Sequence, residues 1–218
     1  MRAEGAPDLH DAILDSAEMH FAKRGYDAVS TRAVARDVGA TAAMIHYYFK
    51  SKRQLFDAVV ARRADVINKE RMDALDAYEK AAKGEPKLEG AISAFLGPVM
   101  TRLEQGEPGW RYYFELIAQI GNKHDWGGEV MTNSFDPVIQ RMMEIIRKVL
   151  PDATEENLYW SYHFLSGALL LTISETDRID RLSGGICQST DIASATPRLV
   201  EFAAAGFMRI CKPQGDVS

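Results

Sequence analysis

Apolar side chains recur every three or four residues along most of this 218-residue chain. Ile13, Leu14, Ala17 and Phe21 form the first such stripe, and this spacing places side chains on one face of an α-helix. No segment alternates apolar and polar residues over the length of a strand, and no Asn-Gly or Asp-Gly pair indicates a hairpin. The pattern therefore predicts an all-α fold.

Glycines, prolines and capping residues divide the pattern into helices. Gly25 and Gly39 each follow a periodic segment, and Gly39 can adopt the left-handed conformation of a tight turn. Ser51 and Gln54 have the spacing of a capping box before a long helix. Its expected apolar face holds Leu55, Phe56, Val59, Val60 and Val66. We expect helices over residues 8–24, 32–38, 42–48, 52–82, 88–103, 110–120, 129–150, 154–175 and 196–211, and an irregular segment over 178–191.

Residues 31–49 contain two short helical segments joined at Gly39. A helix-turn-helix needs this arrangement, because its first helix crosses the DNA backbone while its second presents small and polar residues to the major groove. Ala42 and Ala43 would allow a close approach, and the amides that begin the helix at Lys52 can hold an anion. The segment therefore predicts DNA binding.

The charge distribution agrees with this interpretation. The whole chain has a net charge of −5, but residues 23–53 contain seven Lys or Arg and two Asp or Glu. A local basic patch on an acidic body is typical of a phosphate-binding surface.

The candidate DNA contacts combine small residues, polar side chains that can bond to bases or phosphates, and lysines that can neutralise phosphates. They are Thr31, Arg32, Thr41, Ala42, Ala43, His46, Tyr47, Tyr48, Lys50 and Lys52. Tyr47 could instead be a buried tyrosine, but we favour a phosphate contact.

The first 55 residues resemble the TetR family of regulators. The residues that carry the resemblance are Ile13, Leu14, Ala17, Phe21, Ala22, Gly25, Tyr26, Ser30, Thr31, Arg32, Ala35, Val38, Gly39, the run Ile45 to Lys52, and Leu55. His46 departs from the pattern, since a tyrosine is frequent there, and this puts the contact made at that position in doubt.

The resemblance implies a three-helix DNA-binding head over residues 1–53, with its third helix in the major groove. It also implies a larger helical domain over residues 54–218 that dimerises through its last two long helices and encloses a small-molecule pocket. Two heads would read a palindromic operator, and ligand binding would change their separation and release the DNA.

Two apolar helices near the end of the chain are candidates for the subunit interface. Small residues among large ones allow close helix packing, and the two helices carry more apolar surface than one side can cover. The candidate interface residues are Phe164, Ala168, Leu171, Leu199, Phe202 and Gly206. The alternative is that they form an intramolecular core.

Aromatic and methionine residues in the second domain could line the ligand pocket. The candidates are Trp110, Phe114, Met131, Phe135, Met142, Trp160 and His163. Such stripes are also typical of plain core, and His163 could be a core or interface histidine. Residues 159–168 resemble a subgroup with fatty-acid and acyl-CoA responsive members, which implies an apolar, amphipathic or lipid-like effector.

Other classes of protein fit less well. The sequence shows no nucleophile with a base, paired acids or metal cluster, so we expect no enzyme, catalytic residue, metal or cofactor. Cys187 and Cys211 lie far apart, as reduced thiols in a cytoplasmic protein would. No segment reaches the length of a membrane span. A DNA-binding protein without a small-molecule ligand, either constitutive or controlled by a protein partner, remains an open alternative.

Overall fold

The computed structural model describes residues 8–124 and 126–212, and these residues form ten helices and no strand. The all-α expectation is therefore confirmed. The helices are α1 (Leu9–Ala28), α2 (Thr31–Asp37), α3 (Ala42–Phe49), α4 (Lys52–Ala82), α5 (Leu88–Gln105), α6 (Pro108–Gly121), α7 (Gly127–Val149), α8 (Glu155–Ile173), α9 (Arg178–Leu182) and α10 (Ile192–Cys211).

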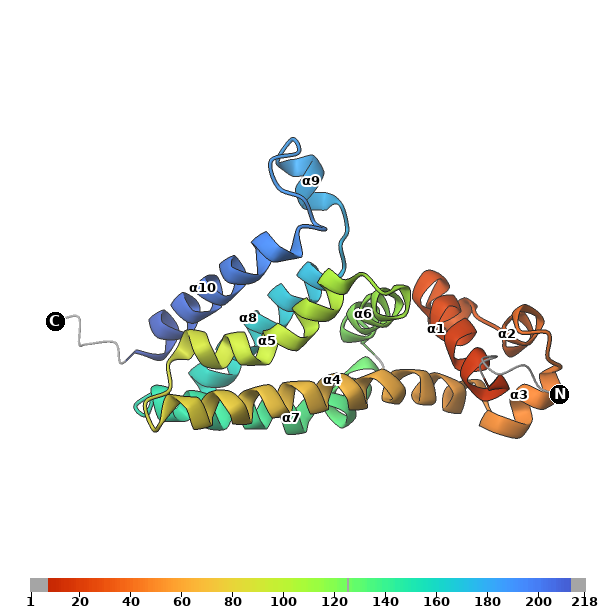
Figure 1. The fold of residues 1–218 in the computed structure, drawn as a ribbon, viewed down its shortest axis with the longest axis horizontal. Helices are drawn as coiled ribbons and strands as arrows, with labels where there is room; N and C mark the ends of the chain where they lie inside the picture. Colours follow the sequence, from red (N-terminus) through yellow and green to blue (C-terminus); the bar gives the residue numbers. More distant parts are fainter. Residues whose placement is uncertain (1–7, 125, 213–218) are drawn as a thin grey trace.

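The molecule is elongated, with α1, α2 and α3 grouped at one end (Figure 1). Helix α4 runs from this head along the whole body, and α7 lies beside it. Helix α6 packs against α1 and so connects the head to the body. Helices α5, α8 and α10 complete the body, while α9 projects away from it.

Side-chain caps begin the helices of the head. The hydroxyl oxygens of Ser30, Thr41 and Ser51 accept hydrogen bonds from the third helical amide of α2, α3 and α4, respectively. The expected capping box at Ser51 forms only in part, because the Ser51 amide donates to the Phe49 carbonyl instead of the exposed Gln54 side chain.

Three sequence expectations need correction. Helix α1 continues to Ala28 past a kink at Gly25, whose φ is 74°. Helix α10 begins four residues early, at Ile192, because the Asp191 carboxylate caps the Ser194 amide, and Pro197 lies inside the helix. A short helix, α9, occupies part of the segment expected to be irregular.

The head has an aromatic core that includes the start of α4. Phe21 and Phe56 meet edge to face with ring centroids 5.2 Å apart, an arrangement favoured by aromatic quadrupoles. Buried His20 contacts the Asp37 carboxylate at 2.5 Å, which fixes the end of α2 against α1. Because the first turns of α4 belong to this core, α4 is shared by the head and the body.

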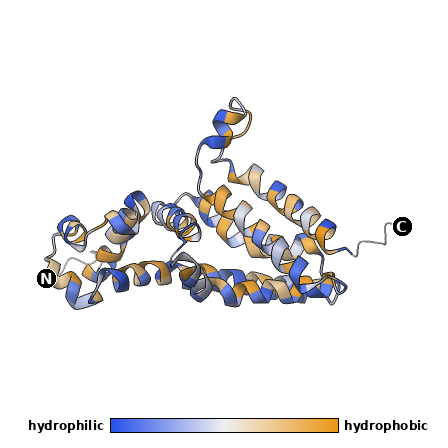
Figure 2. Ribbon diagram, turned by 180° about the vertical axis from the view of Figure 1, so that it is seen from behind, coloured by the Kyte–Doolittle hydropathy of each residue, from blue (hydrophilic) through white to orange (hydrophobic). Residues whose placement is uncertain are grey.

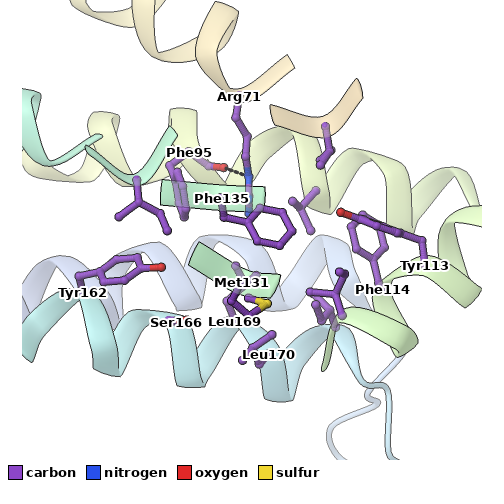
Figure 3. Close-up of a pocket in the computed structure, with 15 residues that line it drawn as sticks. Arg71, Phe95, Tyr113, Phe114, Met131, Phe135, Tyr162, Ser166, Leu169 and Leu170 are labelled. Atoms are coloured by element: carbon purple, nitrogen blue, oxygen red, sulfur yellow. Dashed lines mark hydrogen bonds between the residues drawn. The ribbon is translucent and has the colours of Figure 1, made fainter. Parts of the chain in front are cut away.

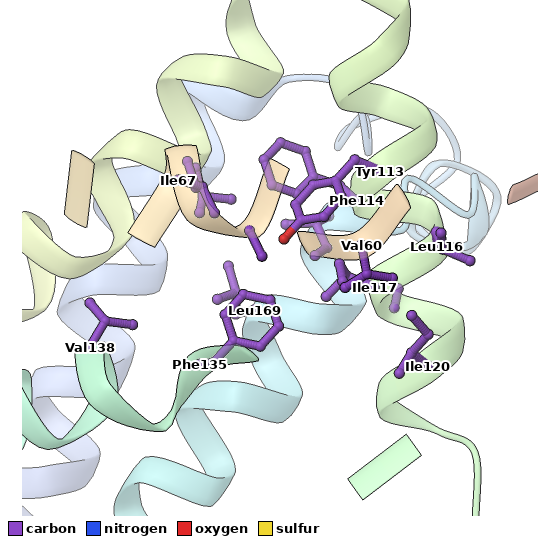
Figure 4. Close-up of a cluster of buried hydrophobic side chains, with 14 of the residues drawn as sticks. Val60, Ile67, Tyr113, Phe114, Leu116, Ile117, Ile120, Phe135, Val138 and Leu169 are labelled. Carbon is purple, nitrogen blue, oxygen red and sulfur yellow. The ribbon is translucent and has the colours of Figure 1, made fainter. Parts of the chain in front are cut away.

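The body core takes buried side chains from all of its long helices, and its part nearest the head lies between α4, α6, α7 and α8. Ile67, Tyr113, Phe114, Phe135 and Leu169 converge there from these four helices (Figure 4). Helices α4 and α7 alternate polar and apolar residues along their length, whereas apolar residues recur along α8 and α10 (Figure 2). In the part of the chain that the structure describes, no helix combines the length and apolar character needed to cross a membrane.

Candidate functional site

Helix α3 presents one polar face to solvent at the end of the head. Ile45 and Phe49, one turn apart, are buried against the other head helices. The opposite face carries Ala42, His46 and Tyr47, and Tyr47 is 73% exposed. A short helix with small residues at its start and a free outer face has the shape that the major groove accepts.

Nine of the ten candidate DNA contacts lie on the head surface, and Lys52 lies at its junction with α4. Arg32, Thr41, Ala42, Ala43, His46, Tyr47, Tyr48 and Lys50 are exposed, while Thr31 and Lys52 are half-buried. Of the three aromatic candidates on α3, Tyr48 has the side chain most restricted by the rest of the head. Its ring packs edge-on against that of His10 in α1, with the ring centroids 5.7 Å apart.

The two lysines have internal partners. The Lys50 ammonium donates to the Tyr47 carbonyl at 2.9 Å. The Lys52 ammonium donates to the Asp27 carbonyl at 3.1 Å and lies 4.5 Å from the centroid of the Tyr26 ring. Carbonyl and ring contacts leave the positive charge in place, so both lysines remain able to attract phosphates.

A cavity of about 50 Å³ lies in the body between α4, α5, α6, α7 and α8. Its wall is mostly apolar, and its polar groups come from Arg71, Tyr113, Tyr162 and Ser166 (Figure 3). A convergence of a few polar groups in an apolar cavity is typical of a small-molecule site.

The structure brings only some of the candidate pocket residues to this cavity. Phe114, Met131 and Phe135 line it. Trp110 is buried beside it, with the guanidinium groups of Arg63 and Arg102 against its ring, and Met142 is fully buried in the core. Neither residue lines the cavity.

Trp160 and His163 lie elsewhere, on the outer face of α8. Trp160 is 51% exposed, and its ring stacks on that of Phe164 at 5.9 Å. His163 is exposed and lies edge-on to Trp160. Their surroundings therefore match an external surface rather than a pocket.

Sequence reasoning missed all four polar residues of the cavity wall, and Arg71 is the charged one among them. The expected apolar face of α4 included Val66, which is 43% exposed. The buried stripe instead runs through Val60, Ala64, Ile67 and Leu75, and Arg71 falls on it. A charged residue in the middle of an apolar helical stripe was the signal, once the phase of the helix is set correctly.

The candidate interface residues are divided between the surface and the core. Phe164, Leu171 and Phe202 are 54%, 64% and 68% exposed. Leu199 is buried, and Ala168 and Gly206 are half-buried. The projecting segment around α9 adds three exposed apolar residues that the sequence did not suggest, Ile179, Leu182 and Ile186.

Helix α6 joins the cavity to the head. Tyr113, Phe114 and Ile117 face the cavity, while the Gln119 side-chain amide donates to the Ala22 carbonyl of α1 at 2.5 Å. A second connection is the buried Glu18 carboxylate of α1, which accepts from Arg63 of α4 at 2.7 Å. Burial raises the Glu18 pKa, and the two arginines beside it, Arg62 and Arg63, oppose the rise.

Comparisons with known proteins agree with this arrangement. The family described as "Bacterial regulatory proteins, tetR family" matches residues 13–59, and the family described as "Tetracyclin repressor-like, C-terminal domain" matches residues 93–206, more than half of the chain. No curated protein matches the sequence.

Several solved structures share the fold. A tetR family transcription regulator from Shewanella sp. PV-4 is 18% identical, with a TM-score of 0.61 over 90% of this chain and 98% of that one. A TetR-like transcriptional regulator from Rhodococcus sp. RHA1 is 22% identical, with a TM-score of 0.56 over 92% of this chain and 99% of that one. The chain therefore belongs to the TetR family of DNA-binding transcriptional regulators, which are not enzymes.

Proposed function

We propose that this regulator is a homodimeric repressor that binds a palindromic operator and leaves it when a small apolar or amphipathic molecule enters the body cavity. The observation that carries the proposal is the exposed face of α3. Its small and polar residues are exposed among the residues that the structure describes, although the opposite face of the helix is buried. The proposed DNA contacts are the ten candidate residues on and around α3, in a head that corresponds to residues 1–53. We further propose a cytoplasmic location, because the protein must reach the DNA that it binds.

The outer faces of α8 and α10 support the dimer. Trp160, Phe164, Leu171 and Phe202 are all more than half exposed. Single exposed apolar residues are common on proteins, but several large ones on two packed helices indicate an interaction surface. A second copy that covers this face would bury them and make a self-complementary interface.

The position of α6 supports release by a ligand. A molecule in the cavity would contact Phe114 on one side of α6, and Gln119 on the same helix bonds to α1. A shift of α6 would therefore change the position of the head relative to the body. Two heads whose separation changes no longer match half-sites at a fixed spacing.

The small volume of the cavity favours a second candidate, a TetR-family regulator that binds no small molecule. It predicts that no ligand changes the affinity for DNA. The polar groups that converge on the cavity weigh against it, since a plain core gains nothing from a buried charge.

Selection of random double-stranded DNA by the purified protein, followed by sequencing, tests the proposal. An enriched palindrome is expected, and its half-site spacing gives the distance between the two heads. A Tyr47→Ala variant is the control: it should enrich the palindrome less strongly if α3 makes the DNA contacts. Absence of enrichment at low salt with ligand-stripped, refolded protein would contradict the proposal.

A further inference from the structure

Arg71 is a buried cation of α4 that lines the cavity. Its side chain is 5% exposed, and its Nε donates to the Phe95 carbonyl at 3.0 Å. Within residues 8–124 and 126–212, no carboxylate forms an ion pair with its guanidinium. Burial lowers the pKa of Arg71 to about 10, so the group still carries its charge near neutral pH.

Two tyrosines of the same cavity wall place their hydroxyl groups near Arg71. The Tyr113 hydroxyl is buried and has no hydrogen-bond partner among the described residues. Tyr162 is half-buried, and Figure 3 shows its hydroxyl and that of Tyr113 pointing toward the middle of the cavity from opposite sides of Arg71. Burial raises the pKa of both phenols, which keeps them protonated as donors.

A purely structural role does not account for this charge. The bond from Nε to Phe95 holds α4 against α5 in the turn before Pro98, but a neutral donor would serve there as well. The guanidinium also lies 4.3 Å from the centroid of the Phe95 ring, which gives part of the compensation that a buried cation needs. Among the described residues, no hydrogen-bond acceptor is found for the remaining donors on Nη1 and Nη2.

We propose that the cavity is a site for a compact organic monocarboxylate, whose two oxygens accept from the Arg71 guanidinium and whose apolar body lies among Phe114, Phe135 and Leu169. Arg71 supplies a planar fork of donors that matches a carboxylate. The Tyr113 and Tyr162 hydroxyls are placed to donate to the same anion. This inference rests on the proposed function, because it names the chemistry of the effector.

The cavity size limits the body of the acid. A cavity of about 150 Å³ accepts benzene, whereas the cavity here has a volume of about 50 Å³. Even a single ring therefore requires side chains to move, and Met131, a flexible residue of the cavity wall, is suited to that. A ring or a short branched chain fits this space better than a long acyl chain.

Binding of acetate, benzoate and octanoate to the full chain, each compared with its neutral amide by calorimetry and thermal shift, tests the proposal. We expect at least one acid to bind wild-type protein about tenfold or more tightly than its amide. In Arg71→Met that preference should disappear, and in Arg71→Lys, which keeps the charge without the fork, it should be reduced. Lys69→Met removes an exposed charge on the same helix and should leave it unchanged.

The proposal is overturned if no acid binds more tightly than its amide, or if Arg71→Met keeps the preference. DNA binding by the same samples separates this inference from the proposed function. If amides bind and release DNA without any preference for acids, the effector proposal stands and the carboxylate site fails. If an acid binds through Arg71 without changing the affinity for DNA, the carboxylate site stands and effector-controlled release fails.

Discussion

Tyr47 is the residue on which the DNA-binding account depends most. Its side chain is 73% exposed, and its ring lies edge-on to that of Tyr48 and beneath the Lys50 ammonium. Such exposure of a large aromatic residue contributes little to folding. Its role is therefore more easily explained by a partner outside the chain than by the core.

Replacement of Tyr47 by alanine should weaken DNA binding about tenfold across operator sequences, because a phosphate contact is lost without loss of base reading. The thermal unfolding midpoint should stay nearly unchanged. Fluorescence anisotropy with the selected duplex measures the effect. Tyr159→Ala, an exposed tyrosine of α8, is the control, and equal affinity of both variants would exclude the role of Tyr47.

Lys52→Ala should weaken binding and lower the dependence of log K on log salt by about one counterion. The ammonium is anchored by the Asp27 carbonyl but keeps its charge. Titrations of the duplex at several salt concentrations give the slope. An unchanged slope in a folded variant would show that Lys52 does not neutralise a phosphate.

The outer residues of α3 were predictable from sequence, whereas the polar centre of the cavity was not. Ile45 and Phe49 set the buried face of α3, so the exposed face follows from helical geometry. On α4, Val66 is as apolar as its neighbour Ile67, and sequence alone placed the wrong one inside. Tertiary packing against α5 and α7 decides the phase and thereby buries Arg71.

At the level of elements, α4 and α7 are held together by a charged network around Glu79. Its carboxylate accepts from the Lys148 ammonium at 2.5 Å and from the Arg141 guanidinium at 2.6 Å. These hydrogen bonds lower the Glu79 pKa below its ordinary value of 4.5. The network should stabilise the fold when Glu79 is ionised, fully above that value, and lose its effect as the pH falls through the lowered pKa.

Glu79→Gln should therefore lower the free energy of unfolding by about 1 kcal/mol or less near pH 7. The difference from wild type should narrow as the pH falls below about 4. Thermal or urea unfolding at several pH values measures both. Glu85→Gln alters an exposed carboxylate without an ion pair in the described structure and should show no such change, and a constant difference at every pH would contradict the argument.

Most helix boundaries follow from local chemistry that is visible in the sequence. The caps at Thr41, Ser51 and Thr154 form as hydrogen bonds. The start of α10 could not be read from the sequence in this way. Pro197 suits the first turn of a helix, but the helix begins further upstream, where Asp191 caps it. Two acceptable starts in one segment can be separated only by the packing of buried Ile192.

For the whole molecule, the central expectation is that two chains act together. Phe202→Asp should convert the dimer to a monomer, because it would place a charge in an apolar interface. Sedimentation velocity measures the mass. Val66→Asp changes an exposed apolar residue of α4 and should leave the dimer intact, so a Phe202→Asp protein that stays dimeric would exclude the α8–α10 face.

The general plan of a DNA-binding head on a helical body was predictable, since many spaced positions in the first 55 residues agree with one family. The cavity was harder to predict, because it is assembled from five helices far apart in the chain. Trp160 and His163 show the difficulty: both are aromatic, but α8 turns them outward. Which face of a helix is covered depends on neighbours that the local pattern does not contain.

The most direct test compares the affinity of the protein for duplexes that carry one or two copies of the selected half-site. A dimer that reads both half-sites should bind the pair about a hundredfold or more tightly than the single site, and Phe202→Asp should remove this advantage. Equal affinity of the wild-type protein for both duplexes would contradict a dimer that reads a palindrome.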